Sequence, residues 1–241
     1  MSDRDTIIEK CLTAVSLLKK NPPLVHNVTN LVTMETVANV LLALGASPIM
    51  AHAEEELDAI LAMAQVLVLN IGTLDEAWLQ SIEAAQCIAL KRGLPIVFDP
   101  VGAGASRLRQ EACQRILERG VTILRGNASE ITAIANEQAA GRGVDSMQES
   151  SDVIDAATVL TWQNKCCVVV SGATDIVIDN NSQTFIKHGS RLMTHLTGMG
   201  CAVTAVIGAF AAVVKNDPAL ASRYAMLAMG LAAEKAEQIA A

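Results

Sequence analysis

Short apolar runs alternate with longer helical stretches along most of this chain, and this alternation constrains the fold more than any other feature. The expected strands are residues 24–28, 48–51, 66–71, 95–99, 121–125 and 166–171. The expected helices are residues 32–44, 55–64, 76–92, 107–119 and 129–136. A βαβα order with continuous apolar strands is typical of a mostly parallel sheet covered by helices on both faces. The sequence therefore predicts an α/β protein, a three-layer α/β/α sandwich.

The pattern changes in the last third of the chain. Residues 175–179 and 184–187 flank the turn-forming residues 180–183, which predicts a hairpin. Helices are expected at residues 201–214 and 218–240. Residues 137–151, rich in Gly, Ser and charge, are either a connection or a flap. No boundary is evident, so residues 1–241 are expected to form a single domain.

Composition excludes several classes of protein. Hydrophobic residues make up 51% of the chain and charged residues 18%, so a deep core is expected. The net charge is −7 and no dense Lys/Arg stripe occurs, which argues against nucleic acid or an anionic membrane as partner. The apolar run 202–214 is too short to span a bilayer. The six cysteines form no CxxC pair and no export signal is visible, so we expect reduced thiols and a cytoplasmic location.

Candidate site residues lie at or just past the ends of the predicted strands. In such sheets ligands bind beyond the carboxyl ends of the strands, so these residues should line one rim. They are Asn27, Met50, Gly72, Thr73, Asp99, Arg125, Asn127, Ser171 and Gly172.

A glycine-rich turn, Thr197-Gly198-Met199-Gly200-Cys201, precedes the apolar helix expected at residues 201–214. Free N–H groups at a helix start can hold an anion, and glycines at 198 and 200 allow close approach of the backbone. The alternative is a tight turn with no ligand. We favour a phosphate site, because phosphoryl transfer depends on donors that neutralise phosphate oxygens.

Asp99 and Glu130 are the candidate ligands for Mg²⁺, which prefers few carboxylates together with water and phosphate oxygens. Asp99 could instead be a structural acid that accepts hydrogen bonds from the backbone of the loop 102–104. Glu130 could instead close a capping box with Asn127 as the N-cap, and capping is compatible with a role near the metal.

Cys201 lies on the first turn of the predicted helix. The helix N-terminus and nearby cations are expected to lower the pKa of its thiol. Cys201 would then accept or orient the proton of a substrate hydroxyl while supplying little rate. A small buried thiol that only packs under the turn is the alternative.

Three further residues each have a functional and a structural interpretation. Arg125 can bind phosphate oxygens in a bidentate way, or it can form a structural ion pair. Met50 can pack on a heterocycle or fill the core. Asn27 can donate to a heterocycle or merely cap a turn.

Several blocks along the chain resemble the hydroxyethylthiazole kinase family, and they occur in the order found in that family. The blocks are residues 23–30 (PLVHNVTN), 42–50 (LALGASPIM), 69–74 (LNIGTL), 99–104 (DPVGAG), 125–130 (RGNASE) and 197–201 (TGMGC). The resemblance implies a ribokinase-like fold and phosphorylation of the hydroxyl of 4-methyl-5-(2-hydroxyethyl)thiazole by ATP, a step of thiamine salvage. It also implies Mg²⁺ and a homotrimer with active sites near subunit interfaces.

The resemblance assigns roles to individual residues. It implies that Met50 and Gly198 touch the thiazole, and that Arg125 and Ser171 bind ATP. Ser171 stands where threonine is frequent in the family, and Ala173 stands where an acid is frequent. The missing acid puts nucleotide affinity in question.

Two other functions are compatible with the sequence. One is a related ribokinase-like kinase that acts on a pyrimidine alcohol or a sugar, although such kinases mostly have aspartate at the position of Cys201. The other is a non-catalytic module that binds nucleotide, which Ala173 alone favours.

Overall fold

A single eight-stranded sheet runs through the molecule in the order β2-β1-β3-β4-β5-β6-β7-β8. The computed structural model describes residues 3–141 and 153–240. Strands β1 to β6 are parallel, and β7 and β8 are antiparallel additions at one edge. The strands are β1 (Leu24–Val28), β2 (Ser47–Ile49), β3 (Val66–Asn70), β4 (Ile96–Asp99), β5 (Ile123–Asn127), β6 (Cys167–Ser171), β7 (Asp175–Ile178) and β8 (Gln183–Ile186). The predicted mostly parallel sheet and its hairpin are therefore confirmed.

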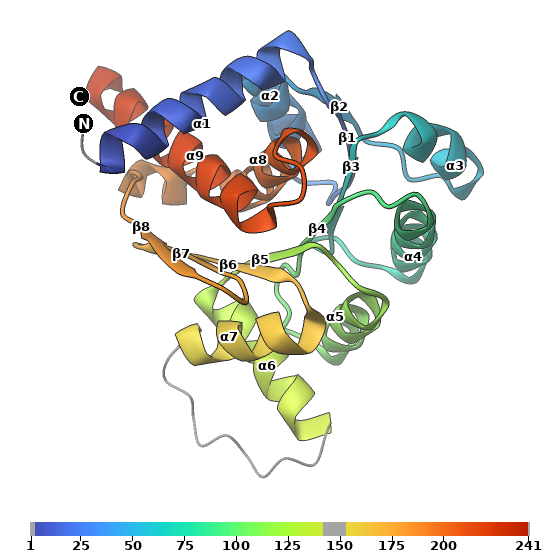
Figure 1. Cartoon of the computed structure of the whole chain (residues 1–241). Coiled ribbons are helices and arrows are strands. Elements are labelled where there is room, and N and C mark those ends of the chain that lie inside the picture. Colours follow the sequence, from blue (N-terminus) through green and yellow to red (C-terminus); the bar gives the residue numbers. More distant parts are fainter. Residues whose placement is uncertain (1–2, 142–152, 241) are drawn as a thin grey trace.

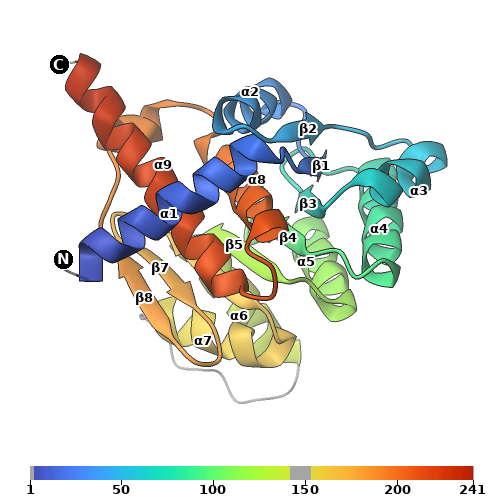
Figure 2. The same cartoon turned by 45° about the horizontal axis from the view of Figure 1, so that its top comes forward.

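Helices cover both faces of the sheet, so the three-layer sandwich is confirmed as well (Figure 1). One layer consists of α1 (Asp3–Lys20), α2 (Met34–Leu44), α8 (Met199–Val213) and α9 (Pro218–Ala240). The other consists of α3 (Glu54–Met63), α4 (Glu76–Lys91), α5 (Arg107–Arg119), α6 (Ala128–Gly141) and α7 (Val153–Asn164). A short 3₁₀ helix, η1 (Arg191–His195), precedes α8. Figure 2 shows α1 and α9 crossing the same face beside α8.

The two-residue period of the strands divides the core between the layers. In β6, Val168 and Val170 pack into the core under α3–α7, whereas Cys167 and Val169 pack into the core under α1, α2, α8 and α9. Cys166 lies in the first of these cores, so the two adjacent cysteines point to opposite faces, as expected. Both thiols are free.

The structure corrects several expected elements and bounds. Helix α6 continues to Gly141 instead of stopping at residue 136, because Ala, Glu and Gln are good helix formers and carry the helix onward. Helix α7 was not predicted, although Ala156, Ala157, Leu160 and Thr161 form a buried stripe at helical spacing. Strand β5 begins and ends two residues later than expected. Most of the segment 137–151 lies outside the described residues.

In the part of the chain that the structure describes, no helix is both long and apolar enough to cross a lipid bilayer.

Candidate active site

The carboxyl ends of β3 to β6 bring Asp99, Asn127 and Ser171 to one rim, together with Asn70, whereas Arg125 lies within β5, two residues before its end. Asn70 at the end of β3 pairs in register with Asp99 at the end of β4. Asn127 at the end of β5 pairs with Ser171 at the end of β6. The N-terminus of α8 meets this rim, because Thr204 on its second turn contacts Asp99.

Asp99 is a fully buried carboxylate held from two sides. The Thr204 hydroxyl donates to Asp99 Oδ2 at 2.7 Å, and Arg125 Nη1 lies 3.7 Å from the same oxygen. Burial raises the pKa of Asp99 to about 6, against the lowering effect of Arg125 and Thr204, while the charge of Glu130 adds to the increase. As an alternative, Asp99 was expected to accept hydrogen bonds from the backbone of the loop 102–104. The structure shows other donors, since the N–H of Gly102 donates to Glu130 and the Thr204 hydroxyl of α8 donates to Asp99.

Glu130 forms the capping box that its spacing predicted. The N–H of Asn127 donates to Glu130 Oε2, and the N–H of Glu130 donates to Asn127 Oδ1, both at 2.9 Å. The N–H of Gly102 donates to the other oxygen, Oε1, at 2.9 Å. Glu130 therefore joins the start of α6 to the loop that follows Asp99.

The glycine-rich turn lies directly against Arg125 and the loop after β1. Gly198 is the N-cap of α8 and has left-handed backbone angles, φ 86° and ψ 0°. A Cβ at Gly198 would lie 2.8 Å from Thr33 Cγ2, and one at Gly200 would lie 3.0 Å from Arg125 Nη1. Gly198 thus requires glycine for its backbone angles and for close packing, whereas a Cβ at Gly200 would meet only the end of the Arg125 side chain. The Arg125 guanidinium is held beside the free N–H groups of the helix start, a combination suited to phosphate.

Cys201 is partly buried within a network of amides. The Asn30 amide donates to Cys201 Sγ at 3.2 Å and to Asn70 Oδ1 at 3.0 Å, and the Thr33 hydroxyl donates to Asn30 Oδ1 at 3.0 Å. Burial, followed by the charge of Asp99, raises the pKa of the Cys201 thiol. The expected lowering of this pKa is therefore wrong, because desolvation and the charge of Asp99 outweigh the hydrogen bonds from neighbouring side chains, which lower it.

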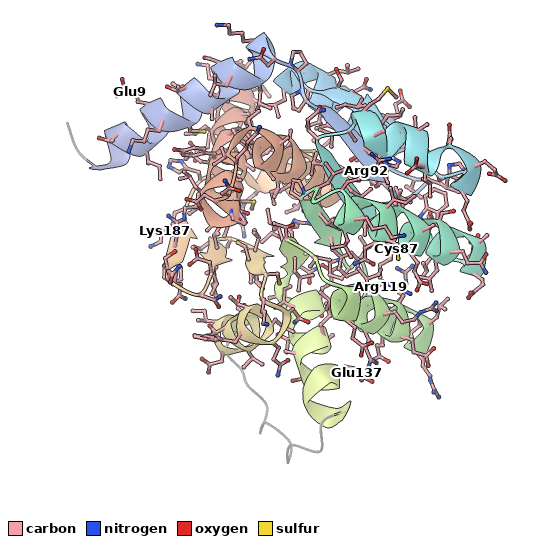
Figure 3. All side chains as sticks on the ribbon, turned by 45° about the vertical axis from the view of Figure 1, so that its right-hand side comes forward. Glu9, Cys87, Arg92, Arg119, Glu137 and Lys187 are labelled. Carbon is pink, nitrogen blue, oxygen red and sulfur yellow. The ribbon has the colours of Figure 1, made fainter. Side chains whose placement is uncertain are left out.

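A cavity of about 570 Å³ opens beside the turn, on the β6–β8 side of the sheet. Arg125 and Ser171 line its polar end, where Arg125 Nη2 donates to Ser171 Oγ at 2.7 Å. Its apolar wall includes four methionines, Met193, Met199, Met226 and Met229. Lys187, which directly follows β8, lines this cavity. Cys87 on α4 and Arg119 on α5 lie far from Lys187, on another side of the molecule (Figure 3). The cavity has the size of a small-molecule site, with an apolar lining and a few polar groups.

Met50 and Asn27 are placed differently. Met50 is partly buried and packs on the same core cluster as Cys201. The Asn27 side chain is fully buried, and its amide donates to the carbonyl of Val25 at 2.9 Å. Asn27 thus does not cap a turn.

Sequence reasoning missed several residues that build the site, among them Asn30, Asn70, Thr204 and Asp175. Thr204 is four residues after Gly200, one helical turn on, and this spacing could have indicated that its side chain points to the rim. Asp175 lines the same cavity as Arg125 and Ser171, and its carboxylate accepts from the N–H of Gly172 at 3.0 Å. Burial raises the pKa of Asp175.

Comparisons with known proteins decide the family. The model of the "Hydroxyethylthiazole kinase family" matches residues 15–241. The chain belongs to the hydroxyethylthiazole kinase family. It is 46% identical over 225 residues to a hydroxyethylthiazole kinase of Oleidesulfovibrio alaskensis, with 92% of this chain and 85% of the relative covered.

Solved structures agree with this assignment. The structure of a hydroxyethylthiazole kinase protein from Pyrococcus horikoshii OT3 matches with a TM-score of 0.87 and 41% identity, covering 96% of this chain and 87% of that one. A ribokinase-like superfamily protein from Enterococcus faecalis V583 matches with a TM-score of 0.63 at 12% identity, covering 89% and 79%. The ribokinase-like fold is confirmed, and the chain is a phosphotransferase with an alcohol group as acceptor.

Proposed function

We propose that this kinase transfers the γ-phosphoryl group of ATP to the hydroxyl of 4-methyl-5-(2-hydroxyethyl)thiazole, in thiamine salvage. One observation carries the proposal. The turn 198–201 lies between the Arg125 cavity on one side and the Cys201 network on the other. A phosphoryl group held by this turn would therefore face a nucleotide on one side and an alcohol on the other.

In the proposed mechanism, the cavity beside Arg125 and Ser171 holds the nucleotide. Arg125 and the N–H groups of Gly198 to Cys201 donate to phosphate oxygens, and this stabilises the charge that develops during transfer. Ala173 brings no acid to this cavity, but Asp175 lies in the same wall. An acid is thus available near the nucleotide despite the substitution at 173.

Asp99 and Glu130 would hold Mg²⁺. No group of three or more His, Cys, Asp or Glu side chains that could hold a metal occurs among the described residues. Two carboxylates nevertheless fit Mg²⁺, which takes its remaining ligands from water and phosphate. The charge of Glu130 raises the pKa of Asp99, and a divalent cation between the two would relieve this repulsion. When bound, the ion would neutralise charge on the phosphates.

The alcohol would lie at Cys201, with Met50 and Gly198 in contact with the thiazole ring and Asn27 behind them. Because the pKa of the Cys201 thiol is raised, the thiol is neutral at pH 7. Cys201 therefore orients the hydroxyl and accepts its proton only weakly.

We also propose a homotrimer in the cytoplasm. Leu31 is 64% exposed and Val32 69% exposed, and the N–H of Leu31 donates to Thr73 at the rim. Exposed apolar side chains so close to the site favour burial against another copy of the chain. All six cysteines are free thiols, which is typical of a reducing compartment.

The test is release of ADP by the purified protein with the thiazole alcohol, a pyrimidine alcohol or ribose as acceptor. We expect turnover with the thiazole alcohol and much less with the others. Turnover only with another acceptor would support the related kinase. ATP binding with no turnover would support the non-catalytic module. A nucleotide-bound crystal with the triphosphate away from residues 198–201 would refute the mechanism.

A further inference from the structure

The guanidinium of Arg109 forms hydrogen bonds with two loops that follow the neighbouring strands β3 and β4. Arg109 lies on the first turn of α5 and is partly buried. Its Nη1 donates to the carbonyls of Ile71 at 2.5 Å and Val101 at 2.6 Å, and its Nη2 donates to the carbonyl of Gly72 at 2.6 Å. Ile71 and Gly72 follow β3, and Val101 follows β4.

Each of these loops carries part of the site. The N–H of Gly72 donates to Asn70 Oδ1 at 2.8 Å, and the same oxygen accepts from Asn30, whose amide also donates to Cys201. Val101 is two residues after Asp99, and the next N–H, that of Gly102, donates to Glu130. One loop is therefore connected to the thiol, and the other to both carboxylates.

The sheet does not fix the distance between these loops. Registered pairing of β3 with β4 ends at Asn70 and Asp99, and the next backbone bond, from Ile71 N to Asp99 O, is already long at 3.4 Å. Arg109 bridges the gap beyond that point. Arginine suits this task, because its planar fork presents donors in fixed directions, whereas a lysine ammonium is a compact charge on a flexible stem.

The bridge is not an ion pair. Among the side chains that the structure describes, no carboxylate lies within 4.0 Å of the Arg109 guanidinium, and its partners are neutral carbonyls. The directions of its N–H groups therefore matter more than its charge.

We propose that Arg109 is a positioning residue for phosphoryl transfer, which holds the Asp99 loop and the Asn70–Asn30–Cys201 network at the separation that aligns acceptor and phosphate. This inference rests on the proposed function. It assigns Arg109 no contact with substrate, nucleotide or metal.

The test compares Arg109→Ala and Arg109→Lys with Arg107→Ala. Arg107 is a matched control, because it lies on the same turn of α5 but its side chain is 89% exposed and, within residues 3–141 and 153–240, forms an ion pair only with Glu111. We expect kcat of Arg109→Ala to fall about 100-fold, the cost of a misplacement of about 1 Å in a positioned site. The Kd of ADP should stay unchanged, because the nucleotide cavity lies over β6–β8. Arg107→Ala should keep the kcat of the unaltered enzyme.

Two rescue experiments distinguish a loss of alignment from a loss of charge and from a general loss of structure. Arg109→Lys keeps the charge and should recover only a small part of kcat. Millimolar guanidinium ion should partly restore kcat of Arg109→Ala, since it can enter the vacated space and donate to the same carbonyls. Full activity of Arg109→Lys would overturn the proposal, and so would a loss in Arg109→Ala that guanidinium does not restore.

Amide hydrogen exchange tests the same inference without turnover. In Arg109→Ala, protection should fall at residues 71–73 and 101–105, and in Arg107→Ala it should not. Unchanged protection at these loops would refute the positioning role. An unaltered enzyme that fails to phosphorylate the thiazole alcohol would refute the proposed function, and the exchange result would still decide the role of Arg109 in holding the loops.

Discussion

The carboxyl group of Asp99 is expected to set the acid side of the activity profile. Burial raises its pKa to about 6, so the group is charged above this pH and neutral below it. A neutral acid cannot hold a divalent cation, and kcat/KM should therefore fall as the pH falls through about 6. The measurement is kcat/KM between pH 5 and 8, the range over which the charge of Asp99 changes.

The variant Thr204→Val tests whether Asp99 is the group whose protonation lowers kcat/KM at acid pH. The Thr204 hydroxyl stabilises the charged form of Asp99, so its removal should raise the pKa of Asp99 and move the acid limb to higher pH. Thr161→Val is the matched control, since this buried hydroxyl donates to the carbonyl of Ala157 in its own helix. A limb that moves to lower pH in Thr204→Val, or moves equally in both variants, would contradict the assignment.

Cys201→Ala should retain much of the activity. A general base contributes roughly 10²–10⁴-fold, but a thiol with a raised pKa is neutral at pH 7 and acts only weakly in this role. We therefore expect kcat to fall by less than about tenfold. Steady-state kinetics of Cys201→Ala and Cys201→Ser check this, and complete loss of turnover in both would show that the thiol is essential.

Single residues could be placed from the sequence where a local rule applied. The strand-end rule predicted that Asp99, Arg125 and Ser171 share a rim, and Asn127 and Glu130 formed their capping box because three-residue spacing determines it. The pKa of Cys201 was mispredicted because it depends on burial. Thr204, which donates to Asp99, is 105 positions away from it along the chain, and Asn30 is 171 positions away from Cys201, to which it donates. Only tertiary packing brings these pairs into contact.

At the scale of elements, the start of α8 depends on Gly198. Alanine there must adopt φ near 86° and must place its Cβ 2.8 Å from Thr33 Cγ2. We expect Gly198→Ala to lose about 1–3 kcal/mol of stability from backbone strain, together with most of the activity, because the turn moves away from Arg125. Urea unfolding and kcat are the measurements.

Gly93→Ala provides the control for Gly198→Ala. Gly93 has φ 66°, but nothing lies within 4 Å of the position that its Cβ would take. This variant should be strained without a clash and should keep its activity. Thr33→Ser, which removes Cγ2, should restore part of the activity to Gly198→Ala. Equal losses of activity at positions 93 and 198 would show that the turn has no special role.

Elements were predictable where the apolar pattern was strong. Strand Leu24–Val28 and the helices Arg107–Arg119 and Pro218–Ala240 have the expected bounds. Helix α7 was missed although its sequence is largely apolar and places Ala156, Ala157 and Leu160 at helical spacing. The sheet order is a product of packing between layers, and periodicity alone does not specify it.

At the scale of the whole molecule, the site lies where three parts of the fold meet. The parallel strands supply the rim, helix α8 supplies the turn, and the β6–β8 edge with α9 supplies the cavity beside Arg125. The antiparallel hairpin extends the sheet, and Asp175 at the start of β7 forms part of the wall of that cavity. The sequence predicted the hairpin but not its place beside the cavity.

The proposed trimer predicts that Val32→Glu changes both assembly and activity. Val32 is 69% exposed on the loop that leads from β1 to the site, and a charge there would be buried against the neighbouring copy. Met63→Glu on α3 is the control, because Met63 is 57% exposed in the opposite helical layer. Light scattering should give three chain masses for the unaltered protein and for Met63→Glu, and a smaller assembly with reduced kcat for Val32→Glu. If the unaltered protein is a fully active monomer, the proposed trimer is refuted. If Val32→Glu is still a trimer, this loop lies outside the interface.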